Sequence, residues 1–460
     1  MGAKLSAWGI HSGLRVWELL VLSFVLQLGM LPLMAQEFHR VALLGPLANL
    51  FVVPLTGVIV PFGFVCLGCA GVLPRAAVWM AHPLTWLVIA QQHIVSLLAK
   101  IPRGNYRIPG PPAWVIVGFF VIAVIAVARL RNQQQLRRSE ACGLASVLIL
   151  AAAIIAVYPF RPLVRRGELE ITVLDVAQGD SILVVSPKGS TLLIDGGGAF
   201  EGFRGREEHW GPDPGEEAVS AYLWARGFQN LDAVALTHAH QDHIGGLTAV
   251  LQNFHVARLL VGRDTAAPAY ARLLTLAGAL QVPVEHERRS QSFQWDGVDV
   301  DVLWPQVAPD QVAPLAKNND SLVVRLKFGD RTILLPGDAE KQVEYQMLNE
   351  NAPGFLHADV LKVGHHGSKN SSMPEFLGAV SPQIAIISAG EENPYGHPHA
   401  ELLERLHAGA IRTYRTDRDG AVQVLTDGHN LRVSCFVDCS GREPPLAQAQ
   451  SPNHHEDQQQ

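Results

Sequence analysis

Long apolar stretches dominate the first 160 residues of the chain, whereas short apolar segments separated by polar turns fill the rest. Each early stretch approaches the roughly 20 residues that a helix needs to cross a bilayer. The stretches lie at 17–35, 41–56, 57–74, 83–99, 113–130 and 143–160. Pro54 and Pro61 interrupt the second and third stretches, which could instead form one re-entrant pair. We therefore expect an α-helical transmembrane domain of five or six helices over residues 1–160.

The pattern changes at Glu168, where strand-like segments joined by turns begin. The first of these segments are 169–176, 181–186 and 191–195. Helices are expected between later strands, near 267–280, 339–350 and 400–408. This alternation predicts an α/β sandwich over residues 161–440, in which two sheets pack together and helices lie outside. The polar, low-complexity tail at 441–460 is expected to be disordered.

The charge distribution supports a boundary near residue 160. Residues 1–160 contain 11 Lys and Arg against 3 Asp and Glu, a net charge of +8, and the remainder has 25 against 39, a net charge of −14. The positive-inside rule favours a cytoplasmic loop at 129–138, which would place the sandwich on the outer side of the membrane. Arg161, Arg165 and Arg166 argue for the opposite side. Cys435 and Cys439 are close enough in sequence for a disulfide, although no pattern requires one.

The sequence LTHAHQDHIGG at 236–246 carries the clearest chemistry. His238 and His240 alternate on an extended segment and can point to one side, while Asp242 and His243 follow at the start of a predicted helix. Imidazole and carboxylate groups are ligands for zinc and similar divalent ions. The spacing therefore predicts two neighbouring ligand sets on one loop. The following glycine pair, 245–246, keeps side-chain bulk away from the backbone.

This residue set resembles that of the metallo-β-lactamase superfamily, which implies further site residues in the same order along the chain. Asp195 in LLIDGGG then orients ligands, Asp338 in LLPGDAE bridges the metals, and His365 or His366 in GHHGSKNSS is a late ligand, with His365 slightly favoured. The superfamily's αββα sandwich is the expected fold.

One ligand of the superfamily pattern has no counterpart. Between the LTHAHQDHIGG segment and Asp338, the only histidines are His255 and His286. Neither lies next to a strand in the way that this ligand usually does. The segment KNNDS stands where this ligand is expected, and Asn318, Asn319 and Asp320 are poorer ligands than imidazole. We expect one or two ions, Zn or Mn, with the position at His238 and His240 the weaker one.

Several segments resemble the ComEC family of DNA-uptake proteins more closely than other members of the superfamily. LDVAQGDSILV is similar to that family's Asp-Val-Gly-Gln-Gly-Asp signature, with Asp180 retained and Ala177 in place of a glycine, so that either backbone freedom is not essential there or the turn has shifted. LGPLANLFVVPLTGVIVPFG is similar to the family's competence segment. The chain looks short for this family, and we expect the membrane region to be incomplete, as in a truncated product, a split protein or a fragment.

The resemblance implies a multi-pass protein of the bacterial inner membrane that takes up DNA during natural transformation. One strand would pass through the channel while the metal-dependent domain hydrolyses the other, with duplex DNA, lipid and further copies or competence proteins as partners. Asp242 would bind metal and hold a proton of the attacking water, and His397 would protonate the leaving oxygen or bind phosphate. Asp180, Asp195 and Asn319 would support the ligands. Contacts with the DNA backbone are expected from Lys362, Ser368, Lys369 and Asn370.

Two alternatives remain open from the sequence. A membrane-anchored metallohydrolase of small phosphodiesters or lactones would use the same ligands. A non-catalytic channel with a scaffolding sandwich would explain the missing histidine. The net charge of −14 also departs from the basic surface typical of nucleic-acid binders, so any contact with DNA should be local.

Overall fold

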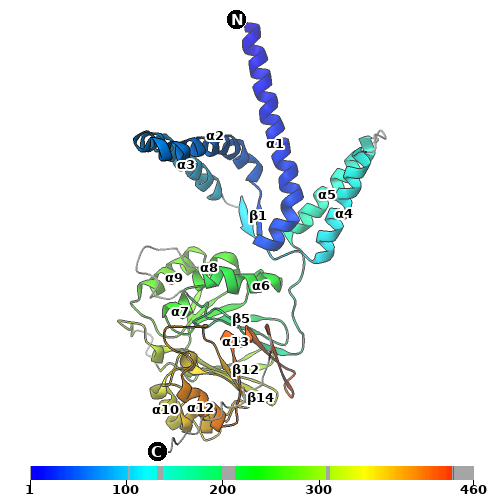
Figure 1. Cartoon of the computed structure of the whole chain (residues 1–460). Coiled ribbons are helices and arrows are strands. Elements are labelled where there is room, and N and C mark those ends of the chain that lie inside the picture. Colours follow the sequence, from blue (N-terminus) through cyan, green and yellow to red (C-terminus); the bar gives the residue numbers. More distant parts are fainter. Residues whose placement is uncertain are drawn as a thin grey trace, which may run out of the picture. The chain divides into compact units, whose positions relative to one another are not determined.

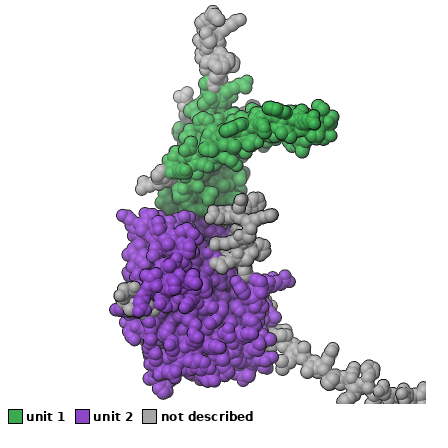
Figure 2. All heavy atoms as spheres, turned by 90° about the vertical axis from the view of Figure 1, so that its left-hand side faces the viewer, with its two compact units in different colours: residues 1–162 green, residues 163–460 purple. Residues whose placement is uncertain are grey.

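The computed structural model describes residues 2–101, 104–131, 138–198, 213–306, 311–437 and 439. The chain divides into two compact units, residues 1–162 and 163–460, which we call the helical unit and the sandwich domain (Figure 2). The predicted tail, 441–460, lies outside the described residues.

The described part of the helical unit forms five helices and two short strands (Figure 1). The helices are α1 (Gly2–Phe38), α2 (Gly45–Val72), α3 (Pro74–Ala99), α4 (Ala113–Arg131) and α5 (Arg138–Val157). The strands β1 (Arg40–Ala42) and β2 (Asn105–Arg107) pair antiparallel. Helices α2 and α3 lie side by side, as do α4 and α5.

Two helices of this unit are long and apolar enough to cross a membrane. They are α1, over Gly13–Phe38, and α2, whereas α4 and α5 contain shorter apolar segments at Ala113–Arg129 and Cys142–Val157. The expected stretches 41–56 and 57–74 are one continuous helix, with Pro54 and Pro61 inside it. The prolines therefore do not create a re-entrant pair. Large apolar side chains such as Phe64 and Leu67 on α2 are 71% exposed, a pattern suited to contact with lipid.

The sandwich domain is built on two mixed sheets. The first has the order β10-β9-β7-β5-β4-β3-β18-β19, and the second β11-β12-β13-β14-β15-β16-β17. In chain order, the strands of the first sheet are β3 (Leu169–Val173), β4 (Ile182–Val185), β5 (Thr191–Ile194), β7 (Ala233–Leu236), β9 (Leu259–Val261), β10 (Val284–His286), β18 (Val422–Thr426) and β19 (Leu431–Cys435). Those of the second are β11 (Ser292–Trp295), β12 (Val298–Trp304), β13 (Val323–Phe328), β14 (Arg331–Leu335), β15 (Val360–Lys362), β16 (Ile384–Ile387) and β17 (Arg412–Arg415). A further small pair is β6 (Asn230–Leu231) with β8 (His255–Val256).

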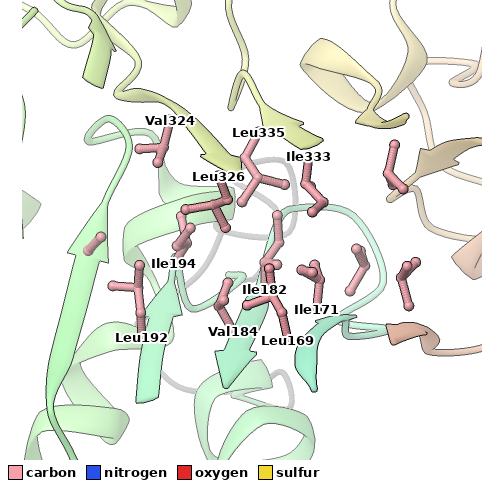
Figure 3. Close-up of a cluster of buried hydrophobic side chains, with 14 of the residues drawn as sticks. Leu169, Ile171, Ile182, Val184, Leu192, Ile194, Val324, Leu326, Ile333 and Leu335 are labelled. Carbon is pink, nitrogen blue, oxygen red and sulfur yellow. The ribbon is translucent and has the colours of Figure 1, made fainter. Parts of the chain in front are cut away.

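The two sheets face each other through a shared apolar core. Every second residue of β3, β4 and β5 points into it, and Figure 3 shows these side chains opposite those of β13 and β14. The residues labelled there are Leu169, Ile171, Ile182, Val184, Leu192, Ile194, Val324, Leu326, Ile333 and Leu335. Strands with one face on such a core and the other under helices are apolar on both faces, which explains runs such as ILVV at 182–185.

Helices cover the outer face of each sheet through two further apolar clusters. The helices of the first half are α6 (Ala221–Ala225), α7 (Gln241–Ile244), α8 (Leu247–Asn253) and α9 (Pro268–Ala279). Those of the second half are α10 (Lys341–Glu350), α11 (Pro374–Val380), α12 (Ala400–Ala408) and α13 (Thr416–Asp419). The helix–sheet–sheet–helix order confirms the predicted αββα sandwich.

Parallel strand pairs bring the LTHAHQDHIGG segment and the later candidate site residues to one end of the sandwich. In the first sheet β5 and β7 run parallel, and in the second β14 and β15 do. Asp195 follows β5, the LTHAHQDHIGG segment follows β7, Asp338 follows β14 and His366 follows β15. Carboxyl ends of parallel strands lie at the same edge, where loops can share one site.

Candidate metal centre

Four side chains from three strand ends form one candidate ligand group: Asp242, His243, Asp338 and His366. Their ligand atoms all lie within 4.8 Å of one another. Asp338 Oδ2 is 3.2 Å from His243 Nε2 and 3.3 Å from His366 Nε2. Asp242 Oδ2 is 3.2 Å from His366 Nε2. The segment after β7 therefore supplies two ligands, and the loops after β14 and β15 supply one each.

The donor atoms of this group suit a divalent ion. His243 Nε2, His366 Nε2 and Asp338 Oδ1 are buried and have no hydrogen-bond partner among the described residues. Two imidazoles and two carboxylates are a donor set that Zn²⁺ and Mn²⁺ accept. The residues present therefore fit a divalent metal, which would satisfy the two imidazole nitrogens that have no hydrogen-bond partner among the described residues.

The electrostatics of the group point the same way. Burial alone would lower the pKa of His243, but the carboxylates of Asp338, Asp195 and Asp242 raise it well above its ordinary value. Burial opposes ionisation of Asp338, but the imidazoles of His366 and His243 hold the pKa of Asp338 well below its ordinary value. Asp338 is thus ionised and needs nearby positive charge, which protons or a dication can provide.

The other nitrogens of the two histidines are held by the protein. His243 Nδ1 donates to Asp195 Oδ2 at 2.7 Å, and Asp195 also accepts from the Thr237 amide and hydroxyl. His366 Nδ1 lies 3.1 Å from the Ser388 carbonyl oxygen and 3.3 Å from Asp180 Oδ1. Each arrangement fixes the ring and leaves Nε2 for the ion. The structure thus places Asp195 and Asp180 where the sequence predicted supporting residues.

His238 and His240 form a separate pair. His238 Nε2 lies 2.9 Å from His240 Nδ1, and His240 Nε2 lies 3.1 Å from the Ala316 carbonyl oxygen. Among the described residues, no third His, Cys, Asp or Glu joins them in a ligand group. Ser321, which the sequence analysis did not single out, has its Oγ 3.3 Å from His238 Nδ1. The expectation that this is the weaker metal position stays a prediction.

The histidines and amides considered for the missing ligand lie elsewhere. His255 is exposed in β8, and His286 in β10 contacts Asp264 Oδ1 at 2.9 Å. Asn319 accepts the Glu340 amide through Oδ1, so it supports the start of α10 and does not contact the ligand group. Asn318 is the neighbour that lines the pocket.

The two histidine rings of the GHHG segment point in different directions, and only one of them faces the other ligands. His366 is 1% exposed and lies inside the group, whereas His365 points to Glu340, with its Nδ1 3.0 Å from Glu340 Oε1. The slight preference for His365 is therefore wrong. Both residues have positive φ, 48° and 51°, so the backbone turns sharply and sends the two rings in different directions.

Two of the residues expected to contact DNA are buried. Lys362 is 1% exposed, and its Nζ forms an ion pair with Asp180 inside the domain. Ser368 is 4% exposed, and its hydroxyl accepts the Asn370 amide. Neither can reach a DNA backbone in this conformation, which corrects the expectation for both. Lys369 and Asn370 are exposed and remain available. A lone lysine in the apolar run ADVLKVG was the signal for a buried ion pair.

A pocket of about 250 Å³ opens over the candidate ligand group. It is lined by Gln178, Gly198, His240, Gln241, Asp242, Asn318, Asp338, His365, His366, Tyr395 and His397. The lining is mostly polar, and the His397 ring stacks on Tyr395 at 5.7 Å between centroids. Burial, followed by the neighbouring His365 and His366, lowers the pKa of His397 to about 4. His397 is therefore neutral near pH 7 and better suited to hydrogen bonding than to acting as a cationic acid.

Tight backbone packing accounts for the glycines around the motif. A Cβ on Gly246 would meet the Gly196 carbonyl oxygen at 2.1 Å, and one on Gly179 would meet the Asp242 carbonyl oxygen at 2.2 Å. Ala177 has a φ of 59°, the left-handed region that favours glycine. Ala177 therefore has a conformation that a glycine would adopt more easily.

Two family profiles match the chain. The profile described as "Metallo-beta-lactamase superfamily" covers residues 174–391, and the profile described as "Competence protein" covers residues 3–133. The first match falls in the sandwich domain and the second in the helical unit.

Individual relatives match both units. "ComE operon protein 3" of Bacillus subtilis (strain 168) is 32% identical over 422 residues, 88% of this chain and 51% of the relative. "Competence protein ComA" of Neisseria gonorrhoeae is 30% identical over 422 residues, 88% of this chain and 50% of the relative. The chain spans about half the length of these relatives. Among solved structures, the metallo-beta-lactamase fold protein YhfI from Bacillus subtilis is 14% identical, covers 54% of this chain and 95% of that chain, and has a TM-score of 0.34.

Proposed function

The chain belongs to the competence-protein family, whose members it matches across both the helical unit and the metallo-β-lactamase domain, and we propose that it takes part in DNA uptake. The sandwich domain hydrolyses phosphodiester bonds of the strand that is not transported, using a bound Zn²⁺ or Mn²⁺. The observation that carries this proposal is the group of Asp242, His243, Asp338 and His366 at the base of an open polar pocket.

The reaction assigns distinct work to the residues of the pocket. A divalent ion, when bound, supplies a Lewis acid that activates water and offsets negative charge on the phosphoryl oxygens. Asp242 is 28% exposed, so its carboxylate reaches the pocket and can hold a proton of the attacking water. His397, neutral near pH 7, can donate a hydrogen bond to a phosphoryl oxygen. This role fits its pKa better than the expected protonation of the leaving oxygen.

The surroundings of the pocket offer limited positive charge. Lys369 is exposed on the loop that follows His366, and Arg405 of α12 donates to the Lys369 carbonyl oxygen. The Arg405 guanidinium also donates to the Glu401 carbonyl oxygen, so Lys369 is the cation more free to contact a phosphate of bound DNA. The remaining acidic surface favours weak, local contact, and delivery of DNA then falls to the channel or to partner proteins.

The pocket gives less support to the two alternatives. Pockets for small organic ligands are typically lined mostly by apolar and aromatic side chains, whereas all the side chains that line this pocket are polar or charged. Tyr395 is the one aromatic residue other than histidine in its lining. A scaffold without metal would not explain why two imidazoles and two carboxylates converge with all their ligand atoms within 4.8 Å of one another.

A comparison of substrates tests the proposal against these alternatives. The full chain in detergent is given linear duplex DNA, bis(p-nitrophenyl) phosphate or a lactone, each with Mn²⁺ or Zn²⁺, and Asp242→Ala is the control. We expect DNA to be cleaved most efficiently and only by the unmodified chain. Turnover of the lactone without cleavage of DNA would favour the small-ester hydrolase, and inactivity on all three by a metal-loaded chain would favour the scaffold.

The apolar helices and the family suggest membrane association, and the finer location belongs to the proposal. We place the chain in the bacterial inner membrane as a multi-pass protein, alone or with further copies, with the sandwich domain outside. The disulfide between Cys435 and Cys439 supports this side, because disulfides persist in oxidising compartments. An alkaline phosphatase fused after residue 437 should be active in cells, and an inactive fusion of normal abundance would reverse the orientation.

A further inference from the structure

Lys362 is a buried cation beside the candidate metal centre. Its side chain is 1% exposed, as is that of its ion-pair partner Asp180. Lys362 Nζ also lies 4.0 Å from Asp338 Oδ1. An ammonium is strongly disfavoured in a protein interior unless nearby charges compensate it, so these two carboxylates hold it in place.

The two oxygens of Asp338 have different surroundings. Oδ2 faces His243 Nε2 and His366 Nε2, where the candidate ion would bind. Oδ1 is buried, accepts no hydrogen bond from the described residues and faces the Lys362 ammonium. A carboxylate that bridges two dications offers an oxygen to each. Here the second oxygen already lies beside a fixed positive charge, which would repel another cation.

The charges nearest to the ligand group balance with one dication. Asp180, Asp242 and Asp338 carry three negative charges, and one dication with the ammonium carries three positive charges. Asp195 lies on the opposite edge of His243 and has its own donors in that ring and in Thr237. One dication with the ammonium therefore leaves no excess positive charge in this buried region.

Two nearby places among the described residues could be considered for a second ion. The first is the group of Asp180, Asp195 and His243, whose ligand atoms lie within 4.8 Å of one another, but Lys362 already pairs with Asp180, and the His243 ring already donates to Asp195. The second place is poorly equipped. His238 and His240 face each other across 2.9 Å, and Ser321 contacts His238 on the other side. Hydroxyl and amide groups cannot replace a third imidazole as ligands for Zn²⁺ or Mn²⁺ at equal strength.

We propose that the Lys362 ammonium takes the place of a second metal ion, so that the centre holds one dication tightly, on Asp242, His243, Asp338 and His366. This inference rests on the metal-binding part of the proposed function and is independent of the substrate. Lys362 is a positioning residue in this scheme, because it acts through Asp338 and Asp180.

Metal titration of the full chain in detergent tests the inference without any substrate. Mn²⁺ binding is followed by equilibrium dialysis and elemental analysis in the unmodified chain, in Lys362→Met and in the charge-balanced Asp180→Asn/Lys362→Met double variant. The double variant keeps the buried region neutral and guards against misfolding of the single variant. Lys188→Met is the matched control, because the Lys188 side chain is 74% exposed.

The unmodified chain and the control should bind one ion tightly and a second only at concentrations about 100-fold higher or more. Loss of the ammonium should tighten the second binding event about tenfold or more in Lys362→Met, and by a smaller factor in the double variant, which also loses the Asp180 carboxylate. Two ions of similar affinity in the unmodified chain would overturn the inference. A second event that is unchanged or unmeasurable without Lys362 would also overturn it. A chain that binds no ion at all would refute the metal-binding part of the proposed function instead.

Discussion

His243 and Asp195 are joined by a buried hydrogen bond of 2.7 Å between Nδ1 and Oδ2, and both side chains are fully buried. Asp195 follows β5 and His243 lies in α7, so the bond connects two loops that are 48 residues apart. It fixes the imidazole with Nε2 toward Asp338. The geometry of one ligand therefore depends on a residue that does not itself belong to the four-residue ligand group.

Replacement of Asp195 should weaken metal binding without removing a ligand. Asp195 accepts hydrogen bonds from the His243 ring and from Thr237 through its carboxylate. The side chain of an asparagine has only one oxygen, so Asp195→Asn cannot accept all of these bonds. We expect the affinity for Mn²⁺ or Zn²⁺ to fall about 10- to 100-fold, the usual effect of losing such a partner. Competition with a chelator measures this. An unchanged dissociation constant in a folded variant would contradict the role given to Asp195.

The two adjacent histidines should behave differently. His366→Ala removes an imidazole from the ligand group and should reduce bound metal to well below one ion per chain. His365→Ala removes a ring that contacts Glu340 at the pocket and should leave the bound metal unchanged. Elemental analysis after dialysis distinguishes the two variants. The reverse result would show that the backbone turn at this segment has been assigned incorrectly.

Glu344 should make the stability of the sandwich domain depend on pH. It is buried on α10 and accepts the backbone N–H groups of Ser372 and Met373, the end of the loop that carries His366. Burial raises the pKa of Glu344 from 4.5 to about 7, despite the opposing effect of these donors and of Arg405. Glu340 on the same helix adds to the increase.

Because this folded-state pKa exceeds the unfolded value, the stabilisation is complete below the unfolded value and is lost as the pH rises toward 7. This pKa difference contributes up to about 3 kcal/mol to the free energy of unfolding. Glu344→Gln should therefore flatten the dependence of the free energy of unfolding on pH in this window, whereas Glu375→Gln, at an exposed position of α11, should not. Denaturant unfolding at several pH values between 4.5 and about 7 measures this dependence. If the free energy of unfolding changed equally with pH in both variants, Glu344 would be excluded as the cause.

Ala177 offers a test of the turn before β4. Its φ of 59° costs a residue with a side chain about 1–2 kcal/mol, whereas glycine pays about 0.5–1 kcal/mol in lost chain entropy. Ala177 is exposed, so its methyl group contributes little packing. Ala177→Gly should be neutral or stabilising by up to about 1 kcal/mol. A clear loss in the free energy of unfolding would mean that this turn has another conformation.

The sequence allowed the fold and half of the site to be predicted, because both depend on local pattern. Short apolar segments indicated the two sheets, and the spacing of Asp242 and His243 indicated a ligand set on one loop. The exact ligand in GHHG could not be predicted, because adjacent residues in a tight turn differ in direction through backbone angles that sequence does not reveal.

Burial caused further errors. Lys362 and Ser368 have side chains typical of DNA contacts, but each is satisfied inside the domain by a partner distant in sequence or by a local backbone group. The division into two spans at 41–56 and 57–74 was wrong for a different reason: Pro54 and Pro61 lie inside one helix, α2. Prolines interrupt helices in water more reliably than in membrane segments, where neighbouring groups satisfy the freed backbone.

Cleavage of DNA by the intact chain tests the central claim most directly. End-labelled linear duplex DNA is incubated with the full chain in detergent over a range of Mn²⁺ or Zn²⁺ concentrations, beside Asp338→Asn and Asp330→Asn. Asp330 is 78% exposed on the turn between β13 and β14 and serves as the matched control. We predict metal-dependent cleavage by the unmodified chain and the control, and a loss of about 100-fold or more in Asp338→Asn. Equal cleavage by Asp338→Asn, or none by a metal-loaded unmodified chain, would contradict the account.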